Sequence, residues 1–211
     1  MSVVMPAPRY RSRPNKPQLP KPWRWTRADY HRARELGFFS EDDMVELIDG
    51  EIYTASPQSR KHFNAIQRGA RVLARVFGTN YSVEQQGPAG IASGSEPEPD
   101  VMVIRGESED YEEHPEPADI VLLVEVSDSS LAKDRVLKGS SYARAGIADY
   151  WLLNLKNRTL EVRRDSGPMP NDPLTIGYRS VKVLTEQDAV SPLAVPAASI
   201  RVTGLLNRAT L

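Results

Sequence analysis

The chain has 211 residues, 40% of them hydrophobic, and a net charge of −1, which suits one soluble domain with a full core. Cysteine is absent, which excludes disulfides and thiolate zinc sites, and the histidines His31, His62 and His114 stand too far apart to suggest a local metal motif. The first residues lack the apolar core of a signal peptide, and no apolar run approaches the roughly 18 residues of a membrane span. We therefore expect a cytoplasmic protein with no membrane partner.

A basic N-terminal segment precedes an acidic body. Residues 1–27 contain seven of the 27 basic residues and none of the 28 acidic ones, so residues 28–211 carry a charge of −8. Because six prolines keep the segment extended, we predict a disordered tail over residues 1–25 and one domain over 26–211. The tail is either a solubilising leader or an arm along a phosphate backbone. The arm residues are Arg9, Arg11, Arg13, Lys16 and Lys21.

The first elements after the tail are a short helix and a hairpin. A capping box that begins at Thr26 predicts a helix over residues 27–36. The pair Asp49-Gly50 suits a type I′ turn, which predicts a hairpin over residues 44–54 with Glu46 on its first arm.

A longer helix and two strands come next. Apolar residues at helical spacing predict an amphipathic helix over residues 60–77. Strands are predicted over 81–86 and 98–104, the second apolar with a carboxylate at its entrance, and the acidic, proline-bearing stretch 105–117 is typical of a surface loop.

Residues 118–155 predict a strand, a helix and a second strand. The apolar run 120–126 is broken once, by Glu125, and a helix of about 16 residues ends at Gly146 before the apolar run 150–155. Since both runs are apolar on both faces, we expect a central, parallel pair of strands with the helix as the crossover.

The last third of the chain is predicted to be mostly β. Asn157-Arg158 marks the turn of a hairpin into a strand over 159–164, and residues 178–184 form another strand. Residues 165–177 are predicted to be a loop rich in proline and glycine, and the apolar stretch 192–206 has no clear period.

Two carboxylates stand in or beside apolar strands, where an ionised group is costly unless it is paired, hydrogen-bonded or bound to a metal. They are Glu125 and, 25 residues earlier, Asp100 at the entrance of its strand. If these strands are neighbours, the two carboxylates face each other and suit Mg²⁺, which can polarise a phosphodiester and activate a water. The plain alternatives are a buried arginine partner for Glu125 and a loop-ending turn role for Asp100.

Lys138 supplies a cation for such a site. If Ser129 or Ser130 caps the helix, then Asp134, Lys138 and Tyr142 recur every four residues on one helical face. Over the strand ends, the Lys138 amine would position or deprotonate the attacking water. The alternative is a solvated lysine that pairs with Asp134.

A wider ordered set of residues accompanies these groups. It comprises Glu46-Leu47-Ile48-Asp49-Gly50-Glu51, Ser56-Pro57, His62, Pro99-Asp100-Val101, Val124-Glu125-Val126-Ser127, Asp134, Lys138, Tyr142 and Tyr150-Trp151-Leu152. Over about residues 26–207, this set resembles the Uma-type restriction endonucleases of the PD-(D/E)xK nuclease superfamily.

The resemblance implies an α/β fold, namely a restriction-endonuclease-like core with a mixed central sheet, flanking helices and added hairpins. It also implies cleavage of DNA that depends on Mg²⁺ (or Mn²⁺), with Asp100, Glu125 and the backbone carbonyl of Val126 as metal ligands and Lys138 beside them. The usual lysine of the superfamily stands two residues after the second carboxylate, where this chain has Ser127, so Lys138 must substitute from the helix.

Further roles implied by the resemblance have alternatives. Glu46 is either a further metal or water ligand or a solvent-facing hairpin residue. His62 and Asp134 are expected at the rim of the site, although His62 also suits a surface or capping role. Tyr142, Tyr150 and Trp151 are interpreted as core residues.

The sequence leaves more than one function open. The first hypothesis is a DNA endonuclease, for which cleavage of both strands favours a homodimer. The second is a catalytically silent, nuclease-like module that binds nucleic acid or a partner protein. A third is action on RNA or a branched DNA junction.

Overall fold

The computed structural model describes residues 21–40, 42–54, 58–92 and 94–206. Four of the predicted arm residues and one motif pair therefore lie outside the described residues, namely Arg9, Arg11, Arg13, Lys16 and Ser56-Pro57. Lys21 is described and is exposed. The predicted tail of residues 1–25 lies largely outside this part and stays a prediction. Among the described helices, none is long and apolar enough to cross a membrane.

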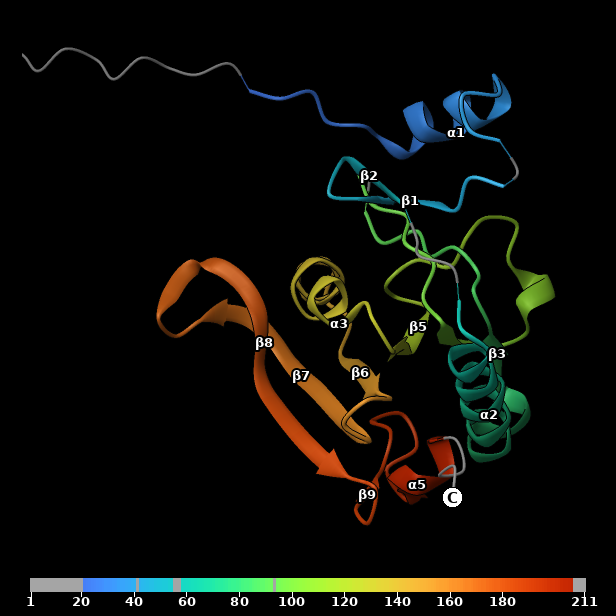
Figure 1. Cartoon of the computed structure of the whole chain (residues 1–211), viewed down its shortest axis with the longest axis vertical. Helices are drawn as coiled ribbons and strands as arrows, with labels where there is room; N and C mark the ends of the chain where they lie inside the picture. The colour runs from blue at the N-terminus through green and yellow to red at the C-terminus, as the bar shows by residue number, and fades with distance from the viewer. Residues whose placement is uncertain (1–20, 41, 55–57, 93, 207–211) are drawn as a thin grey trace, which may run out of the picture.

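Helices are interspersed among the strands in the first two thirds of the chain, strands predominate in the last third, and Figure 1 shows most of the elements labelled. In chain order they are α1 (Arg27–Glu35), β1 (Val45–Ile48), β2 (Glu51–Thr54), α2 (Arg60–Phe77), η1 (Gly78–Asn80), β3 (Tyr81–Glu84), β4 (Val101–Arg105), η2 (Ser108–Asp110), β5 (Ile120–Ser127), α3 (Leu131–Lys133), η3 (Asp134–Lys138), α4 (Gly139–Arg144), β6 (Asp149–Asn154), β7 (Thr159–Met169), β8 (Asp172–Thr185), β9 (Ala189–Val190), β10 (Ile200–Arg201) and α5 (Val202–Leu205).

Six of the strands form one mixed sheet in the order β3-β4-β5-β6-β7-β8. Only β5 and β6 of the described sheet neighbours run parallel, and the other neighbouring pairs are antiparallel. The parallel pair is the one predicted from its apolar runs, and the helical segment between the two strands makes the crossover that such a pair needs.

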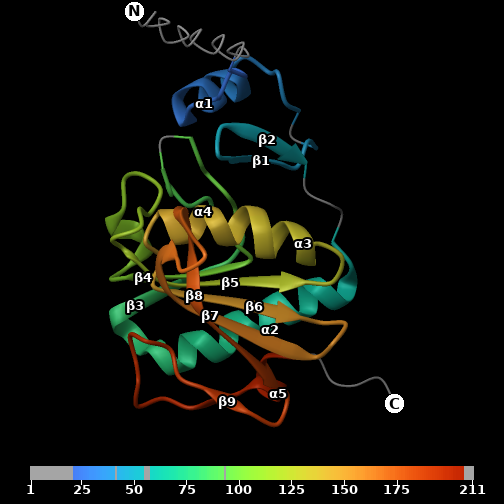
Figure 2. The ribbon, with the colours of Figure 1, turned by 90° about the vertical axis from the view of Figure 1, so that its left-hand side faces the viewer.

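The sheet is covered by helices on both faces, as Figure 2 shows, with α2 on one side and α3, η3 and α4 on the other. Because side chains alternate along a strand, Val124 and Val126 of β5 pack in the cluster that contains the buried residues of α2. Leu123 packs in the opposite cluster with Tyr142 of α4. Glu125 therefore points from the centre of the sheet toward the crossover helix.

The α1 helix and the β1–β2 hairpin lie over the crossover helix, outside the other layers (Figure 2). Their own small core contains Tyr30, Val45 and Leu47. The predicted hairpin turn is confirmed, since Asp49 and Gly50 have φ angles of 53° and 77°, and type I′ turns need positive φ at both positions. Glu46 lies between Val45 and Leu47 on β1, so its side chain points to the opposite face, toward the sheet.

The crossover helix is not the regular α-helix that was predicted. Its middle, η3, is a π-helical turn in which the N–H of Gly139 donates to the carbonyl of Asp134. In an α-helix of 3.6 residues per turn, side chains eight residues apart drift by about 80°. The additional residue of a π-turn cancels most of that drift, so it keeps Asp134, Lys138 and Tyr142 on one face. A repeat of four residues thus fits a helix with a π-turn better than a regular one.

The helix also begins differently from the prediction. Ser130 occupies the N-cap position, but its side chain forms no capping hydrogen bond with the backbone. Its hydroxyl instead donates to the carboxylate of Asp134. The serine therefore orients an acidic side chain of the crossover helix.

The prediction of a loop over residues 165–177 was wrong. Strand β7 continues to Met169 and β8 begins at Asp172, with Gly167 opposite Gly177. The pairing of β7 with β6 ends at Arg164, so the rest of the hairpin is a two-stranded ribbon. Both strands of such a ribbon have an open edge, where proline and glycine are tolerated. Their abundance therefore did not signal a loop.

Candidate active site

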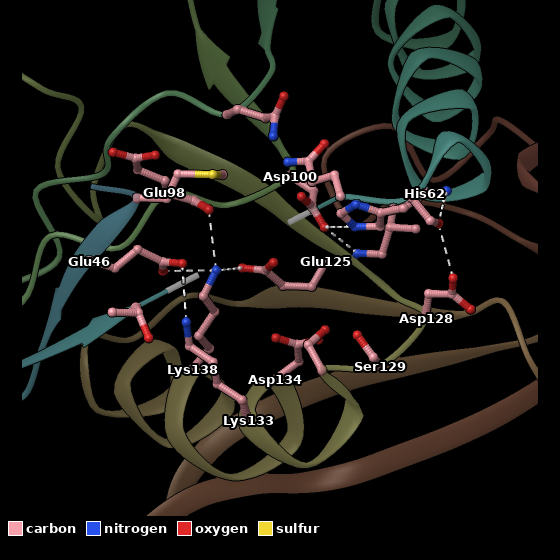
Figure 3. Close-up of a pocket in the computed structure, with 17 residues that line it drawn as sticks. Glu46, His62, Glu98, Asp100, Glu125, Asp128, Ser129, Lys133, Asp134 and Lys138 are labelled. Carbon is pink, nitrogen blue, oxygen red and sulfur yellow. Dashed lines mark hydrogen bonds and ion pairs between the residues drawn. The ribbon is translucent and has the colours of Figure 1, made fainter. Parts of the chain in front are cut away.

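One cavity of about 260 Å³ lies between the β1–β2 hairpin, the crossover helix and the end of β5, and Figure 3 shows its lining. All seven residues that were predicted as catalytic, metal-binding or rim residues line it, namely Glu46, His62, Asp100, Glu125, Val126, Asp134 and Lys138. They come from β1, α2, β5, η3 and the segment before β4. The fold thus brings together groups that are up to 92 residues apart in the sequence.

Asp100 is fixed by two neighbours. Its Oδ2 atom accepts the backbone N–H of Val126, with N and O 2.7 Å apart, and lies 3.1 Å from Nε2 of His62. This histidine stands in the first turn of α2, where its backbone N–H donates to the side-chain hydroxyl of Ser59. Asp100 is therefore a buried, oriented carboxylate and not only the end of a loop.

Glu125 is 2% exposed and has two partners on the crossover helix. Its Oε1 atom accepts the hydroxyl of Tyr142 at 2.7 Å and lies 3.0 Å from Nζ of Lys138. The partners of Glu125 are therefore a lysine and a tyrosine, and not the buried arginine of the alternative interpretation. Both contacts use Oε1.

Lys138 is 4% exposed and is surrounded by oxygen atoms (Figure 3). Its Nζ lies 3.0 Å from Oε2 of Glu46 and 3.0 Å from Oε1 of Glu125, and it donates to the carbonyl of Glu98 at 3.2 Å. The alternative of a solvated lysine paired with Asp134 is therefore not what the structure shows. Glu46 is likewise buried, not solvent-facing, and also accepts from Lys133 at 3.2 Å.

The pKa values in the cavity reflect an excess of carboxylates over cations. Burial raises the pKa of Glu125, and the neighbouring carboxylates raise it further, although Lys138 opposes the shift. Burial by itself would lower the pKa of Lys138, but Glu125 and Glu46 outweigh burial and raise it, so this lysine is a cation. For Glu46, burial is outweighed by Lys138 and Lys133, which lower its pKa.

The two rim residues are also perturbed. Burial would lower the pKa of His62, but the hydrogen bond and the charge of Asp100 raise it. Burial raises the pKa of Asp134 despite its hydrogen bond from Ser130. Raised pKa values of carboxyl groups indicate that this cavity lacks positive charge to balance their ionised forms. A bound cation would supply that charge.

The donor atoms fit a hard divalent cation. The described contacts of Asp100 use Oδ2 and those of Glu125 use Oε1, which leaves one oxygen of each carboxylate for a metal. Oε2 of Glu46 is buried and lies 3.0 Å from Nζ of Lys138, but without hydrogen-bond geometry. Two carboxylates and an open cavity suit Mg²⁺ or Mn²⁺, which fill their other coordination positions with water and substrate oxygens.

Three partners in this cavity were not predicted as site residues. Tyr142 was interpreted as a core residue, and it is fully buried, but its hydroxyl also holds Glu125. Its place in the repeat of four was the signal that pointed to the site. Lys133 and the carbonyl of Glu98 carried no signal, because only the fold brings them to Glu46 and Lys138.

We expect Tyr142→Phe to lower the free energy of unfolding by about 1.5–3 kcal/mol, because the hydroxyl serves a buried, charged acceptor. A matched control is Tyr178→Phe, since the Tyr178 hydroxyl donates to the neutral carbonyl of Ile147 at 2.9 Å in a buried position. That change should cost only about 0.5–1.5 kcal/mol. Urea unfolding of both variants measures the difference. Equal losses in the free energy of unfolding would show that the hydrogen bond from Tyr142 to Glu125 stabilises the fold no more than one to a neutral carbonyl.

Comparisons with known proteins agree with this architecture. The fold is similar to that in a crystal structure of "a putative nuclease belonging to DUF820" from Anabaena variabilis ATCC 29413, with a TM-score of 0.59 and 16% sequence identity. The similarity covers 86% of this chain and 97% of that one. At this identity it establishes the fold class, a nuclease-type mixed α/β sheet flanked by helices.

The family follows from the sequence itself. Residues 27–203 match the Uma2 family, which is described as "Putative restriction endonuclease". The chain therefore belongs to the Uma2 family, as the ordered motifs predicted. No match was found among curated proteins.

Proposed function

We propose that this chain is a metal-dependent DNA endonuclease that hydrolyses phosphodiester bonds at the cavity lined by Asp100, Glu125 and Lys138. One observation carries the proposal: a buried carboxylate directly before β4, a second on the neighbouring β5 and a buried lysine from the crossover helix converge on one cavity. Membership of a family described as restriction endonucleases supports the same reaction class. Mg²⁺ or Mn²⁺, when bound, polarises the phosphodiester and lowers the pKa of a bound water.

Asp100 and Glu125 hold the metal through the oxygens that they do not use within the protein, and the carbonyl of Val126 is the third protein ligand in this proposal. The N–H of the same residue already fixes Asp100. Glu46 keeps the ammonium group of Lys138 beside Glu125. The protein therefore presents an oriented set of ligands before the substrate arrives.

Lys138 acts as a cation in this mechanism. Since its pKa is raised, it positions the attacking water and stabilises charge that develops on the phosphate, and it does not act as the base. The water oxygen forms a bond to phosphorus and releases its proton to solvent, the bond from phosphorus to the leaving oxygen breaks, and that oxygen takes up a proton from solvent. His62 acts as a positioning residue through its contact with Asp100.

The substrate that we propose is DNA, held in part by the basic arm of Arg9, Arg11, Arg13, Lys16 and Lys21. Each contact of such an arm with a phosphate would displace a condensed counterion, so binding should weaken steeply with salt. We also propose a homodimer, because one site per chain cuts one strand at a time.

The test is a plasmid-nicking assay on the wild-type chain with Mg²⁺, with Mn²⁺ and with EDTA, beside Glu125→Gln. We expect nicking with either metal and none with EDTA or with the variant. DNA binding that is sensitive to salt but indifferent to metal, without any nicking, would instead identify a silent, nuclease-like binding module. Nicking of RNA or branched DNA but not of plasmid would retain the chemistry and replace the substrate.

A further inference from the structure

A second cluster of ligand atoms lies beside a neighbouring cavity of about 330 Å³, which shares Glu98 with the lining of the candidate active site. It consists of His31 on α1, Glu96 in the segment before β4, and His114 in the loop after η2. One ligand atom from each residue lies within 4.8 Å of the others. The fold thus brings together two histidines that are 83 residues apart in the sequence.

We propose that His31, Glu96 and His114 bind a transition-metal ion of the Zn²⁺ type. Two imidazole nitrogens and one carboxylate oxygen are a ligand set of zinc sites that keep a further position for water. Imidazole favours Zn²⁺, Co²⁺ and Ni²⁺ over Mg²⁺, so this site and the all-oxygen site at Asp100 and Glu125 should select different metals.

The distances are close to those that zinc requires. With bonds of about 2.0–2.1 Å, ligand atoms around a tetrahedral zinc lie about 3.3 Å apart. Nε2 of His31 lies 2.8 Å from Oε1 of Glu96, and Nε2 of His114 lies 4.0 Å from the same oxygen. The two histidine side chains are 42% and 38% exposed, so their rings are free to rotate by the small amount needed.

The carboxylate of Glu96 is already fixed in position by a hydrogen bond within the protein. It is buried, and its Oε2 atom accepts from Nε of Arg27 at 2.8 Å. Nε2 of His31 lies 2.8 Å from both oxygens of Glu96, and Oε1 is the oxygen that also faces His114. A carboxylate held by an outer partner in this way is typical of metal ligands. The adjacent cavity, which the three residues line, supplies the room for a bound water.

A metal ion at this position would join three segments of the chain. Glu96 also donates its backbone N–H to the carbonyl of Leu47 at 2.8 Å, so it already links the hairpin to the segment that carries Glu98 and Asp100. Arg27 and His31 already join α1 to Glu96, and the ion would add the loop of His114 to that link. We therefore assign it a structural role in holding the N-terminal elements over the candidate active site, independent of whether that site cuts DNA.

The experiment uses the full chain with any histidine tag removed, in buffer with excess Mg²⁺ to occupy the carboxylate site. Co²⁺ is titrated and its visible d–d absorption is recorded, and Zn²⁺ is then added to displace it. We expect one Co²⁺ per chain that resists Mg²⁺. Zn²⁺ at about a hundredfold excess over its dissociation constant should raise the melting temperature by about 5–10 °C.

His114→Gln is the decisive variant, because this half-exposed loop residue can change without disturbing the core. It should unfold at the metal-free temperature of wild type and lose both the cobalt spectrum and the zinc-induced shift, as should His31→Gln. Asp100→Asn should keep both signals. The proposed site would be overturned if cobalt absorption and the zinc-induced rise in melting temperature persist in His114→Gln. It would equally be overturned if wild type shows neither signal, and the cluster would then be only a contact between histidine and glutamate.

Discussion

Replacing Lys138 by methionine is expected to lower the free energy of unfolding by about 3–5 kcal/mol at pH 8, because it leaves the buried Glu125 without a cation and Glu46 with Lys133 alone. Glu125 and Glu46 both lie 3.0 Å from the lysine nitrogen, and neither is exposed to water that could replace it. Methionine keeps most of the side-chain volume, so the loss reports on charge and not on a cavity. Urea unfolding followed by circular dichroism measures it.

The loss should depend on pH in a defined direction. Burial already raises the pKa of Glu125, and removal of Lys138 raises it further. A carboxyl whose pKa is higher in the folded than in the unfolded protein stabilises the fold when protonated, and this contribution is lost as the pH rises through the folded-state pKa. The variant should therefore be closer to wild type at pH 5 than at pH 8.

Lys133→Met is the matched control on the same helical segment. Lys133 also contacts Glu46, at 3.2 Å, but its side chain is 22% exposed and Glu46 keeps Lys138 as a partner. We expect a loss of about 1 kcal/mol or less. Equal losses for the two lysines, or a loss at Lys138 that does not change with pH, would show that the buried charge cluster is not what stabilises this region.

Asp100→Asn should reduce metal-dependent nicking about 10³-fold, which corresponds to about 4 kcal/mol of activation free energy. The amide is isosteric with the carboxylate and its oxygen can still accept the N–H of Val126, so the fold should be retained. What is lost is the negative charge that a metal ligand requires. Single-turnover nicking at saturating Mg²⁺, with the melting temperature as a check on folding, tests the prediction.

Asp128→Asn controls for the loss of one negative charge in the same cavity. Asp128 lines the cavity but accepts from the hydroxyl of Ser59 at 3.0 Å at the exposed end, away from Glu125. This variant should nick within a few-fold of wild type. If Asp100→Asn is as active as Asp128→Asn in protein free of contaminating nuclease, Asp100 has no part in the mechanism.

Much of the fold was predictable because the local signals are strong. The apolar run at residues 120–126 and the helix after it specified the parallel strand pair at the centre of the sheet. Asp49-Gly50 specified the hairpin turn, and the helix over Arg60–Phe77 has the predicted bounds. The set Asp100, Glu125 and Lys138 was named from strand entrances, a buried charge and family motifs, and all three line one cavity.

The remainder depends on contacts that are distant in the sequence. The extension of β7 and β8 comes from pairing across a ribbon, which the glycines and prolines of residues 165–177 concealed. The contact of Lys133 with Glu46 exists only once β1 lies over the crossover helix, and that of Lys138 with the Glu98 carbonyl only once the segment before β4 lies beside this helix. For the same reason, the histidines looked unrelated until α1 and the loop after η2 placed two of them around Glu96.

The π-turn η3 sets the rotation of the crossover helix on either side of it. Such a turn is equivalent to the insertion of one residue into an α-helix, so a deletion of one residue within residues 134–138 would restore a regular helix and leave the flanking segments in nearly the same rotation. A regular α-helix over the same residues, without a deletion, would instead turn Asp134 by about 80° from the face of Tyr142. Lys138 thus reaches Glu125 and Glu46 from a helix whose rotation depends on a local π-turn. A substitution that favours a regular α-helix within residues 134–138 would therefore rearrange the lining of the cavity without altering any strand.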